Sequence, residues 1–445
     1  ELVLACPVSG EGTIKATSGK KILVLGDNSG FLGDWQIVSP VVVSNRYGLG
    51  CSESKGAFFK SGSTKDSLKF GGNGLTNDVP ITLEVEVSPL LRKMDETTGE
   101  LVLNGLVTHK AASTFYTPNA TYAGGIKETS GSLTLNIYNG ADNNYGAKVN
   151  GAWMRIVEKP IKEGAGNLGF GGANNAILNV LFSATGSVAN QTTIQRCHFY
   201  CGAANVVPKQ GDGALNNIVL GGPYTTTQWR TAIFDLNGFD QAAKNIYCNW
   251  TPAEGDGENY RSEVTSPSDA TLTVSPTGRK TTATKYTGAV SLVYAGTGTN
   301  TFAHLLSTTT GRLTVKTGGT VGFKWNAGWQ GPVTVEGGAR LIVNSARAFM
   351  GGTSDIDVAE GGVIELFEGA AFEVKSLTLG DFEVPSGTYT VKISAAYLKI
   401  FDEENGGATP NIYLDAVRVY DPANAAHYIA AANETSVQAE IADVY

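Results

Sequence analysis

The sequence predicts an all-β chain in which short strands stack as a solenoid, and three observations support this fold class. A glycine pair followed by a short alternating segment recurs, as in GGTVGF at 318–323, GGARLIV at 337–343 and GGVIEL at 361–366. Turns rich in glycine fall about every ten to twenty residues, which is typical of repeat architectures. No segment before residue 420 shows a convincing helical period.

The predicted strands are alternating or β-branched segments, each closed by a turn of Gly, Asn, Asp or Ser. The clearest early strands are expected at 21–25, 31–38, 81–87, 101–103 and 133–138. Residues 150–215 are less regular, although 153–157 predicts a strand. The regular pattern returns at 234–241 and continues to residue 392, with a polar excursion at 251–268. We therefore expect one solenoid domain over residues 1–392.

The last part of the chain differs and is expected to cap the solenoid. Residues 412–420 alternate strongly and predict a strand. Asp421 and Pro422 have the pattern of an N-cap followed by proline at the first helical position, so a short helix is expected over 423–432. Because an open solenoid end exposes unpaired backbone and apolar core, we assign residues 393–445 to a C-terminal capping region.

Stacking is required because one short strand buries too little apolar surface to fold alone. Alternate side chains of each strand face the shared interior, and burying one Leu, Val or Ile there contributes roughly 1.5–3 kcal/mol. These contributions offset the cost of ordering a glycine-rich backbone. Along the strand after the second glycine pair, we assign Leu341 to the interior and Arg340 to solvent.

The composition is that of an exported β protein. Gly accounts for 56 of 445 residues and charged residues for 17 %, whereas ordinary soluble proteins have about 25 % charged residues. The net charge of −8 argues against a nucleic-acid partner. No apolar run approaches the roughly 20 residues of a transmembrane helix. We expect Glu1 to be a processed N-terminus and the protein to be extracellular or at the cell surface.

The number of cysteines is odd, which excludes complete intramolecular pairing among Cys6, Cys51, Cys197, Cys201 and Cys248. If their segment is a strand, Cys197 and Cys201 lie roughly 13 Å apart, too far to bond each other. Cys248 is then the candidate disulfide partner of either residue, and the alternative is that all act as small buried hydrophobic residues. Cys197, His198 and Cys201 lack the second ligand pair of a structural zinc site.

Several phrases resemble those of a known family. FDLNGFDQ at 234–241 resembles the LDLNGFxQ phrase of the autotransporter-associated repeat proteins of bacteria. The motifs ATLTV at 270–274, YTGAV at 286–290 and GRLTV at 311–315 occur in the same order as in that family's repeat. LGDNSGFLG at 25–33 is similar to the turn motif of the family. The resemblance implies bacterial export, a right-handed parallel β-helix and a surface-exposed passenger region. The family's repeat carries no catalytic residues to transfer.

No residue is assigned a catalytic role. β-Helix enzymes that degrade polysaccharides need clustered carboxylates, or a base beside a group that neutralises a carboxylate. Asp355 and Asp357 share one face of a predicted strand, and a solvated surface is the alternative to a catalytic pair. Asp402 and Glu404 lie in an acidic turn and are Ca²⁺ candidates through their oxygen ligands. We expect no other cofactor or metal.

Two sets of hydrophobic residues are candidates for partner contacts. Phe323, Trp325 and Trp329 would stack against sugar rings if they lie on the flank of the solenoid, and the alternative is that they fill a wide turn of the core. Residues near both ends would join a neighbouring copy by strand addition. These assembly candidates are Leu2, Val3 and Leu4, and, in a predicted terminal strand, Val437, Ile441 and Val444.

Three classes of function are consistent with these features. The favoured class is an exported, non-enzymatic structural protein, used as a surface spacer, an adhesin or an extracellular filament subunit. Its partners would be other copies of the chain or cell-surface glycans and proteins. The second class is a polysaccharide-degrading β-helix enzyme, a lyase or hydrolase, and the third is a carbohydrate-binding module. The sequence shows no cluster of catalytic groups that would favour the enzyme.

Overall fold

A computed structural model confirms the predicted fold class: parallel sheets coil as a β-solenoid, and no helix occurs in the part of the chain that is described. The structure describes residues 1–17, 19–60, 68–71, 75–84, 91–93, 100–110, 113–116, 120–128, 132–136, 152–156, 166–171, 177–221, 231–248, 262–303, 306–324, 328–344, 353–366, 371–383, 387–389, 398–399 and 416–419.

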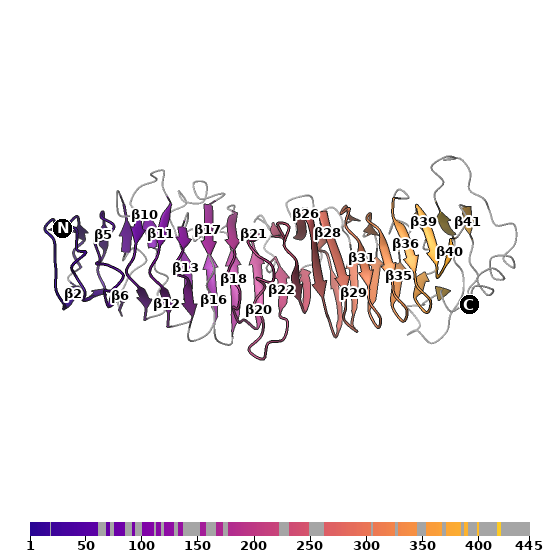
Figure 1. Cartoon of the computed structure of the whole chain (residues 1–445), viewed down its shortest axis with the longest axis horizontal. Coiled ribbons are helices and arrows are strands. Elements are labelled where there is room, and N and C mark those ends of the chain that lie inside the picture. Colours follow the sequence, from indigo (N-terminus) through magenta and orange to yellow (C-terminus); the bar gives the residue numbers. More distant parts are fainter. Residues whose placement is uncertain are drawn as a thin grey trace. The chain divides into compact units, whose positions relative to one another are not determined.

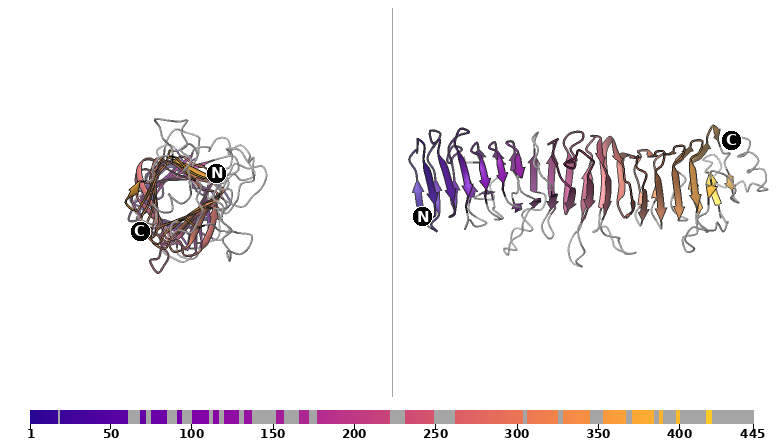
Figure 2. Two further views of the ribbon diagram at one scale, coloured as in Figure 1. Left: turned by 90° about the vertical axis from the view of Figure 1, so that its right-hand side faces the viewer. Right: turned by 90° about the horizontal axis from the view of Figure 1, so that it is seen from below.

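The chain divides into two compact units. Unit 1 consists of residues 1–221 and 225–234, and unit 2 of residues 222–224 and 235–445. In each unit, strands from successive turns lie side by side and wind around an interior (Figures 1 and 2).

Unit 1 is built from parallel strands that pair with strands of the next turn (Figure 1). One sheet contains β1 (Leu2–Leu4), β3 (Ile22–Val24), β5 (Val41–Val43), β7 (Leu68–Phe70) and β10 (Leu91–Lys93). A second contains β2 (Thr13–Ala16), β4 (Asp34–Ile37), β6 (Gly56–Phe59), β9 (Ile81–Leu83), β12 (Val107–His109) and β15 (Ile126–Glu128). A third contains β8 (Thr76–Asn77), β11 (Leu101–Leu103), β14 (Ala120–Tyr122), β17 (Ala152–Ile156), β19 (Leu178–Phe182), β21 (Cys197–Cys201) and β23 (Ala232–Asp235). The fourth contains β13 (Ser113–Tyr116), β16 (Leu133–Asn136), β18 (Asn167–Gly171), β20 (Gln191–Gln195) and β22 (Asn217–Leu220).

Unit 2 repeats this plan. One of its sheets contains β24 (Gln241–Ala243), β26 (Ser262–Val274), β28 (Lys285–Tyr294), β31 (Leu313–Val315), β34 (Val333–Val335), β36 (Asp355–Val358), β39 (Ser376–Leu379) and the antiparallel β40 (Phe382–Glu383). Another contains β27 (Arg279–Thr282), β29 (Thr299–Ala303), β32 (Thr320–Lys324), β35 (Arg340–Asn344), β37 (Val363–Leu366) and β42 (Leu398–Lys399). The remaining strands are β25 (Asn245–Cys248), β30 (Leu306–Ser307), β33 (Gly328–Trp329), β38 (Ala371–Val374), β41 (Gly387–Tyr389) and β43 (Ala416–Val419).

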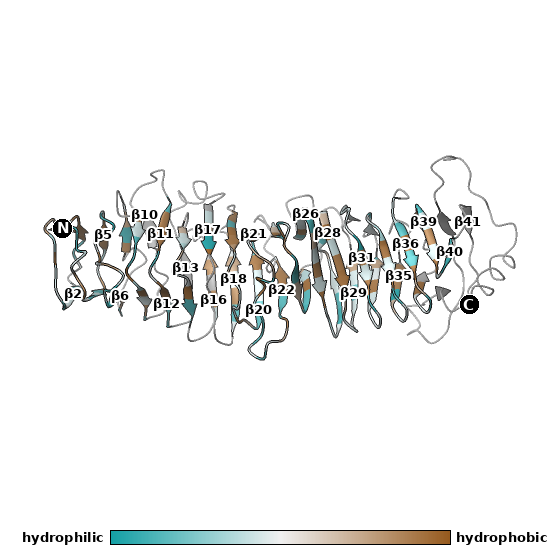
Figure 3. Ribbon diagram, in the orientation of Figure 1, coloured by the Kyte–Doolittle hydropathy of each residue, from teal (hydrophilic) through white to brown (hydrophobic). Residues whose placement is uncertain are grey.

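The register between turns aligns inward residues into apolar columns. In unit 2 one column runs through six buried residues, Leu272, Leu292, Leu313, Val333, Ile356 and Leu377. The outward residues between them are more polar, and Figure 3 shows hydrophobic and hydrophilic residues interspersed along the strands. Leu341 is buried and Arg340 is partly exposed, which confirms the predicted faces of β35.

Some corners bring the backbones of successive turns into contact. A Cβ atom on Gly331 would lie 2.0 Å from the carbonyl oxygen of Gly311, and one on Gly311 would lie 2.1 Å from the carbonyl oxygen of Val290. Any side chain there would push the turns apart. The glycines of the sequence pattern are therefore contact residues between turns as well as turn formers.

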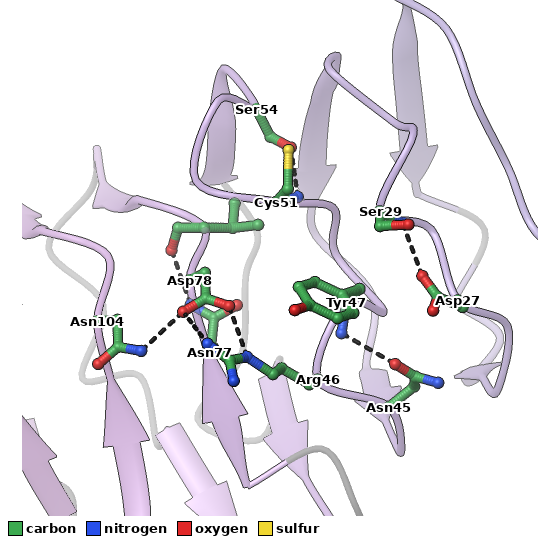
Figure 4. Close-up of polar contacts among 11 residues, drawn as sticks. Asp27, Ser29, Asn45, Arg46, Tyr47, Cys51, Ser54, Asn77, Asp78 and Asn104 are labelled. Atoms are coloured by element: carbon green, nitrogen blue, oxygen red, sulfur yellow. Dashed lines mark hydrogen bonds and ion pairs between the residues drawn. The ribbon is translucent and has the colours of Figure 1, made fainter.

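Polar side chains join neighbouring corners of unit 1 (Figure 4). Arg46 makes a bidentate ion pair with Asp78, at 2.8 Å from Nε and 3.2 Å from Nη2. Asn104 donates to the same carboxylate at 2.7 Å. The hydrogen bond from Arg46 holds the pKa of Asp78 below its usual range. Deeper in the corner, buried Asn28 accepts from the Val8 N–H at 2.7 Å.

Two predicted segments differ from the structure or lie outside it. Residues 262–268, expected within a polar excursion, belong to β26, because their hydroxyl groups are bonded locally: Ser266 donates to the Ser268 carbonyl at 2.6 Å. Of the predicted cap over 393–445, only β42 and β43 are described, and β43 lies within the strand predicted at 412–420. The predicted helix at 423–432 lies outside the described residues.

We predict that Gly331→Ala lowers the free energy of unfolding, because its methyl group would overlap the Gly311 carbonyl of the turn below. Gly278→Ala is the matched control, since a Cβ atom at Gly278 meets nothing within 4 Å. That control should be neutral, or stabilising by about 0.4–1 kcal/mol through the unfolded chain. Urea unfolding measures both variants, and equal stabilities would contradict close contact between turns.

Candidate functional site

The outer face of β17, β19 and β21 in unit 1 gathers aromatic and cationic side chains. Because these strands pair in register, Trp153, Asn179 and His198 form one row across the sheet, and Arg155, Leu181 and Tyr200 form the next. Alternation places Met154, Val180 and Phe199 between the two rows on the buried face. Residues far apart in the sequence are thus brought together on one surface.

Four of these side chains form a stack, which we call the Trp153 cluster: Trp153, Arg155, His198 and Tyr200. The rings of Trp153 and Tyr200 lie 5.2 Å apart at 25°, and those of His198 and Tyr200 lie 3.8 Å apart at 21°. The Tyr200 hydroxyl is 2.8 Å from Nδ1 of His198. The Arg155 guanidinium lies 5.1 Å from the Trp153 ring centre and pairs with Glu100 at 2.5 Å. All four side chains are partly exposed.

The cluster combines aromatic rings with cationic and polar groups on one partly exposed surface. The rings of Trp153, Tyr200 and His198 stack on one another, and the Arg155 guanidinium lies beside the Trp153 ring. Aromatic surfaces combined with a few polar groups recognise partners with both C–H and hydroxyl or carbonyl groups. Glu100 is ion-paired with Arg155 and also accepts a hydrogen bond from Thr121, so its carboxylate is already engaged.

The structure corrects the prediction that Phe323 and Trp329 lie on a sugar-binding flank, because both are 0 % exposed. Phe323 stacks on Phe302, with ring centres 5.5 Å apart. Trp329 packs 5.4 Å from Tyr286 and donates its indole N–H to the Gly311 carbonyl at 3.1 Å. Both residues fill the core, which was the alternative interpretation. Trp325 lies outside the described residues.

Asp355 and Asp357 face outward on β36, but each contacts a cation. Lys375 lies 3.1 Å from Asp355 and Arg312 lies 3.4 Å from Asp357. Burial raises the pKa of Asp355, yet hydrogen bonds from Ser376 and Lys375 outweigh burial and the pKa is lowered. A carboxyl with a lowered pKa is unsuited to act as a general acid.

The described residues include the cysteine candidates but not the acidic residues of the predicted Ca²⁺ site. Asp402 and Glu404 lie outside the described residues, within which no group of three or more His, Cys, Asp or Glu side chains is placed to hold a metal ion. The five cysteines, all of them described, form no disulfide with one another. Cys197 and Cys201 point into the interior, whereas His198 faces outward. Burial raises the pKa of the Cys197 thiol, as expected for a small apolar residue of the core.

The assembly candidates at the N-terminal end lie on an accessible strand. Leu2 and Val3 are 52 % and 49 % exposed, and Leu4 is partly exposed. Their strand β1 pairs with β3 on one side, and no strand among the described residues pairs with its other side. Val437, Ile441 and Val444 lie outside the described residues.

Comparison with protein-family models, with curated proteins and with solved structures gave no match. The resemblance to autotransporter-associated repeats therefore stays a prediction. Within the described segments, no helix is long and apolar enough to cross a membrane.

A buried ionisable pair in unit 1 was not predicted from the sequence. His109 on β12 and Glu128 on β15 are register partners, and both are fully buried. On the other side, His109 is paired with Leu83 of β9. Burial lowers the pKa of His109 to about 3. Alternation in the sequence could have indicated that both side chains face inward, because His109 follows the inward Val107 by two positions and Glu128 follows the inward Ile126 by two positions.

We predict that His109 makes the chain sensitive to acid. Its pKa falls from the ordinary histidine value of 6.5 to about 3 when the chain folds, so between these values the unfolded chain binds a proton that the folded chain does not. The free energy of unfolding therefore falls by about 1.4 kcal/mol per pH unit as the pH drops through this window. Urea unfolding of wild type and His109→Gln should show this dependence only with histidine. His198→Gln, at a partly exposed site, is the control, and equal pH profiles for wild type and His109→Gln would contradict the prediction.

Proposed function

We propose that the chain is an exported, non-enzymatic structural protein that serves as a surface spacer, an adhesin or a subunit of an extracellular filament. The observation that carries the proposal is the in-register stacking of turns over continuous apolar columns. Such a coil gives a large, regular outer surface for contact with other molecules. Bacterial origin and a place among autotransporter-type passengers are part of the proposal and rest on the sequence resemblance.

The outward charges support a structural use of the surface. Glu84 forms ion pairs with Lys60 of the preceding turn and with Lys110 of the following turn. Hydrogen bonds from these lysines, Lys60 foremost, lower the pKa of Glu84. Arg312 and Asp357 likewise join separate turns of unit 2, at 3.4 Å. Carboxylates paired in this way link neighbouring turns across the outer surface.

The exposed edge of β1 is where strand addition would join a second copy. Its unpaired backbone groups would hydrogen-bond to an incoming strand, and Leu2 and Val3 would lose exposed apolar surface. The filament form of the proposal therefore places its assembly contact on this strand.

We predict that wild-type chain self-associates as its concentration rises and that Val3→Lys weakens this association at least tenfold, because a charge would be buried at the contact. Leu106→Lys is the matched control, since Leu106 is 38 % exposed, lies outside the strands and is far from β1 in the sequence. Sedimentation velocity and electron microscopy of the purified chain measure the effect. A monomeric wild type at all concentrations, or unchanged assembly of Val3→Lys, would contradict the filament form.

A second candidate function is glycan binding, and the Trp153 cluster favours it. We predict that Trp153→Ala and Tyr200→Ala reduce binding on a glycan array, because each removes an aromatic surface from the cluster. Tyr47→Ala is the control: Tyr47 is also a partly exposed aromatic residue in unit 1, and its ring centre lies 5.4 Å from the Arg46 guanidinium. Equal binding by all variants would remove this candidate, and shortening of a bound polysaccharide would favour the enzyme class instead.

A further inference from the structure

Three buried polar side chains within residues 286–300 of unit 2 have polar atoms without a hydrogen-bond partner in the described part of the chain. Asn300 on β29 is 0 % exposed, and neither its amide oxygen nor its amide nitrogen is bonded within the described part of the chain. Tyr286 and Tyr294, both on β28, are also fully buried, and their hydroxyl groups have no hydrogen-bond partner there either. Buried polar groups nearly always have a partner, so three unbonded ones in one region need an explanation.

The three side chains enter the interior from two successive strands of one turn, β28 and β29. The ring of Tyr286 meets Phe302 edge to face at 5.5 Å, and Phe302 follows Asn300 by two positions on β29, so both face inward. Tyr294 lies beneath the corner that precedes β32, where its Cδ1 atom is 2.9 Å from a Cβ placed on Gly319. Burial raises the pKa of Tyr286, and Tyr294 raises it further, as expected when the two hydroxyl groups share one interior.

The position of Asn300 does not require a polar residue for the fold. Its register partner on the next turn is Val321, followed by Leu341 and Ile364. All three are buried aliphatic residues, so the same place in the coil accepts an apolar side chain on every following turn. On the preceding turn the register partner of Asn300 is the exposed Lys280, so Asn300 is the first buried residue of this column. A buried amide without a partner loses its hydration without compensation. The asparagine therefore indicates a polar occupant of the interior.

We propose that ordered water molecules occupy the interior of unit 2 and bridge Asn300, Tyr286 and Tyr294. Water fits because the amide nitrogen needs acceptors, the amide oxygen needs a donor, and each hydroxyl can use either. A cation would satisfy the oxygens alone and leave the amide N–H groups unbonded. The buried carboxylate of Glu263 does not face this interior, because Val264, the register partner of Tyr286, occupies the inward face of β26.

This water site distinguishes one turn from its neighbours. Some columns of unit 2 repeat aliphatic residues over several turns, as at Leu272, Leu292 and Leu313, and such columns pack similarly when shifted by one turn. The water-bridged hydrogen bonds can form only when Asn300 and the two tyrosines lie in their native register. The bridging waters therefore raise the free energy of misfolded forms in which strands pair one turn out of register.

Melting temperatures of single and double variants test the proposal. Asn300→Val and Tyr294→Phe should each lower the melting temperature, and the double variant should lower it by less than the sum, because both residues share bridging water. Thr301→Val, on the partly exposed face of the same strand, is the control and should change little. If the interior is dry, removing an unbonded polar group would raise the melting temperature, and that result would overturn the proposal.

A crystal structure of the unchanged chain gives the direct readout and does not depend on any variant folding. We expect water density about 2.7–3.2 Å from the amide atoms of Asn300 and from at least one of the tyrosine hydroxyls. Density with the short, multiple oxygen contacts of a metal ion, or no density at all, would overturn the assignment to water.

Discussion

The structure depends on one constraint, the in-register pairing of each strand with the strand one turn away. Pairing fixes which residues stack, so every inward position becomes part of a column, as in the line from Leu272 to Leu377. It also sets how closely corners approach, which is why Gly331 and Gly311 accept no side chain. Outward charges then pair between turns, as Glu84 does with Lys60 and Lys110.

The sequence predicted those features that depend on alternation within a strand. Glycine pairs and short alternating segments were enough for the solenoid, and they assigned Leu341 and Arg340 to the correct faces. Alternation holds only within one strand, so it could not place Trp329, which lies on a separate short strand, β33. Residues 262–268 were predicted as an excursion because they are polar, whereas Thr265 accepts a hydrogen bond from its register partner Thr287 and Ser266 donates to the Ser268 carbonyl.

The candidate site needed information that one strand does not contain. Trp153 and Tyr200 meet because β19 lies between their strands in register, and the sequence alone does not give the number of residues in each turn. Part of the signal was nevertheless present: Trp153 and Arg155 flank buried Met154, while His198 and Tyr200 flank buried Phe199. Aligning these two patterns as stacked strands would have predicted the cluster. The interior site around Asn300 needed in addition the register that aligns this asparagine with Val321, Leu341 and Ile364 of the following turns.

Disulfide trapping between stacked turns tests the central claim most directly. Thr314 and Thr334 are outward-facing register partners on β31 and β34, and adjacent strands lie about 4.8 Å apart, within disulfide reach. In a background without the native cysteines, Thr314→Cys with Thr334→Cys should oxidise rapidly to an intramolecular disulfide, detected by mass spectrometry. Thr314→Cys with Thr378→Cys, three strands apart in the same column, should remain reduced. Equal oxidation of both pairs, or of the distant pair alone, would contradict in-register stacking.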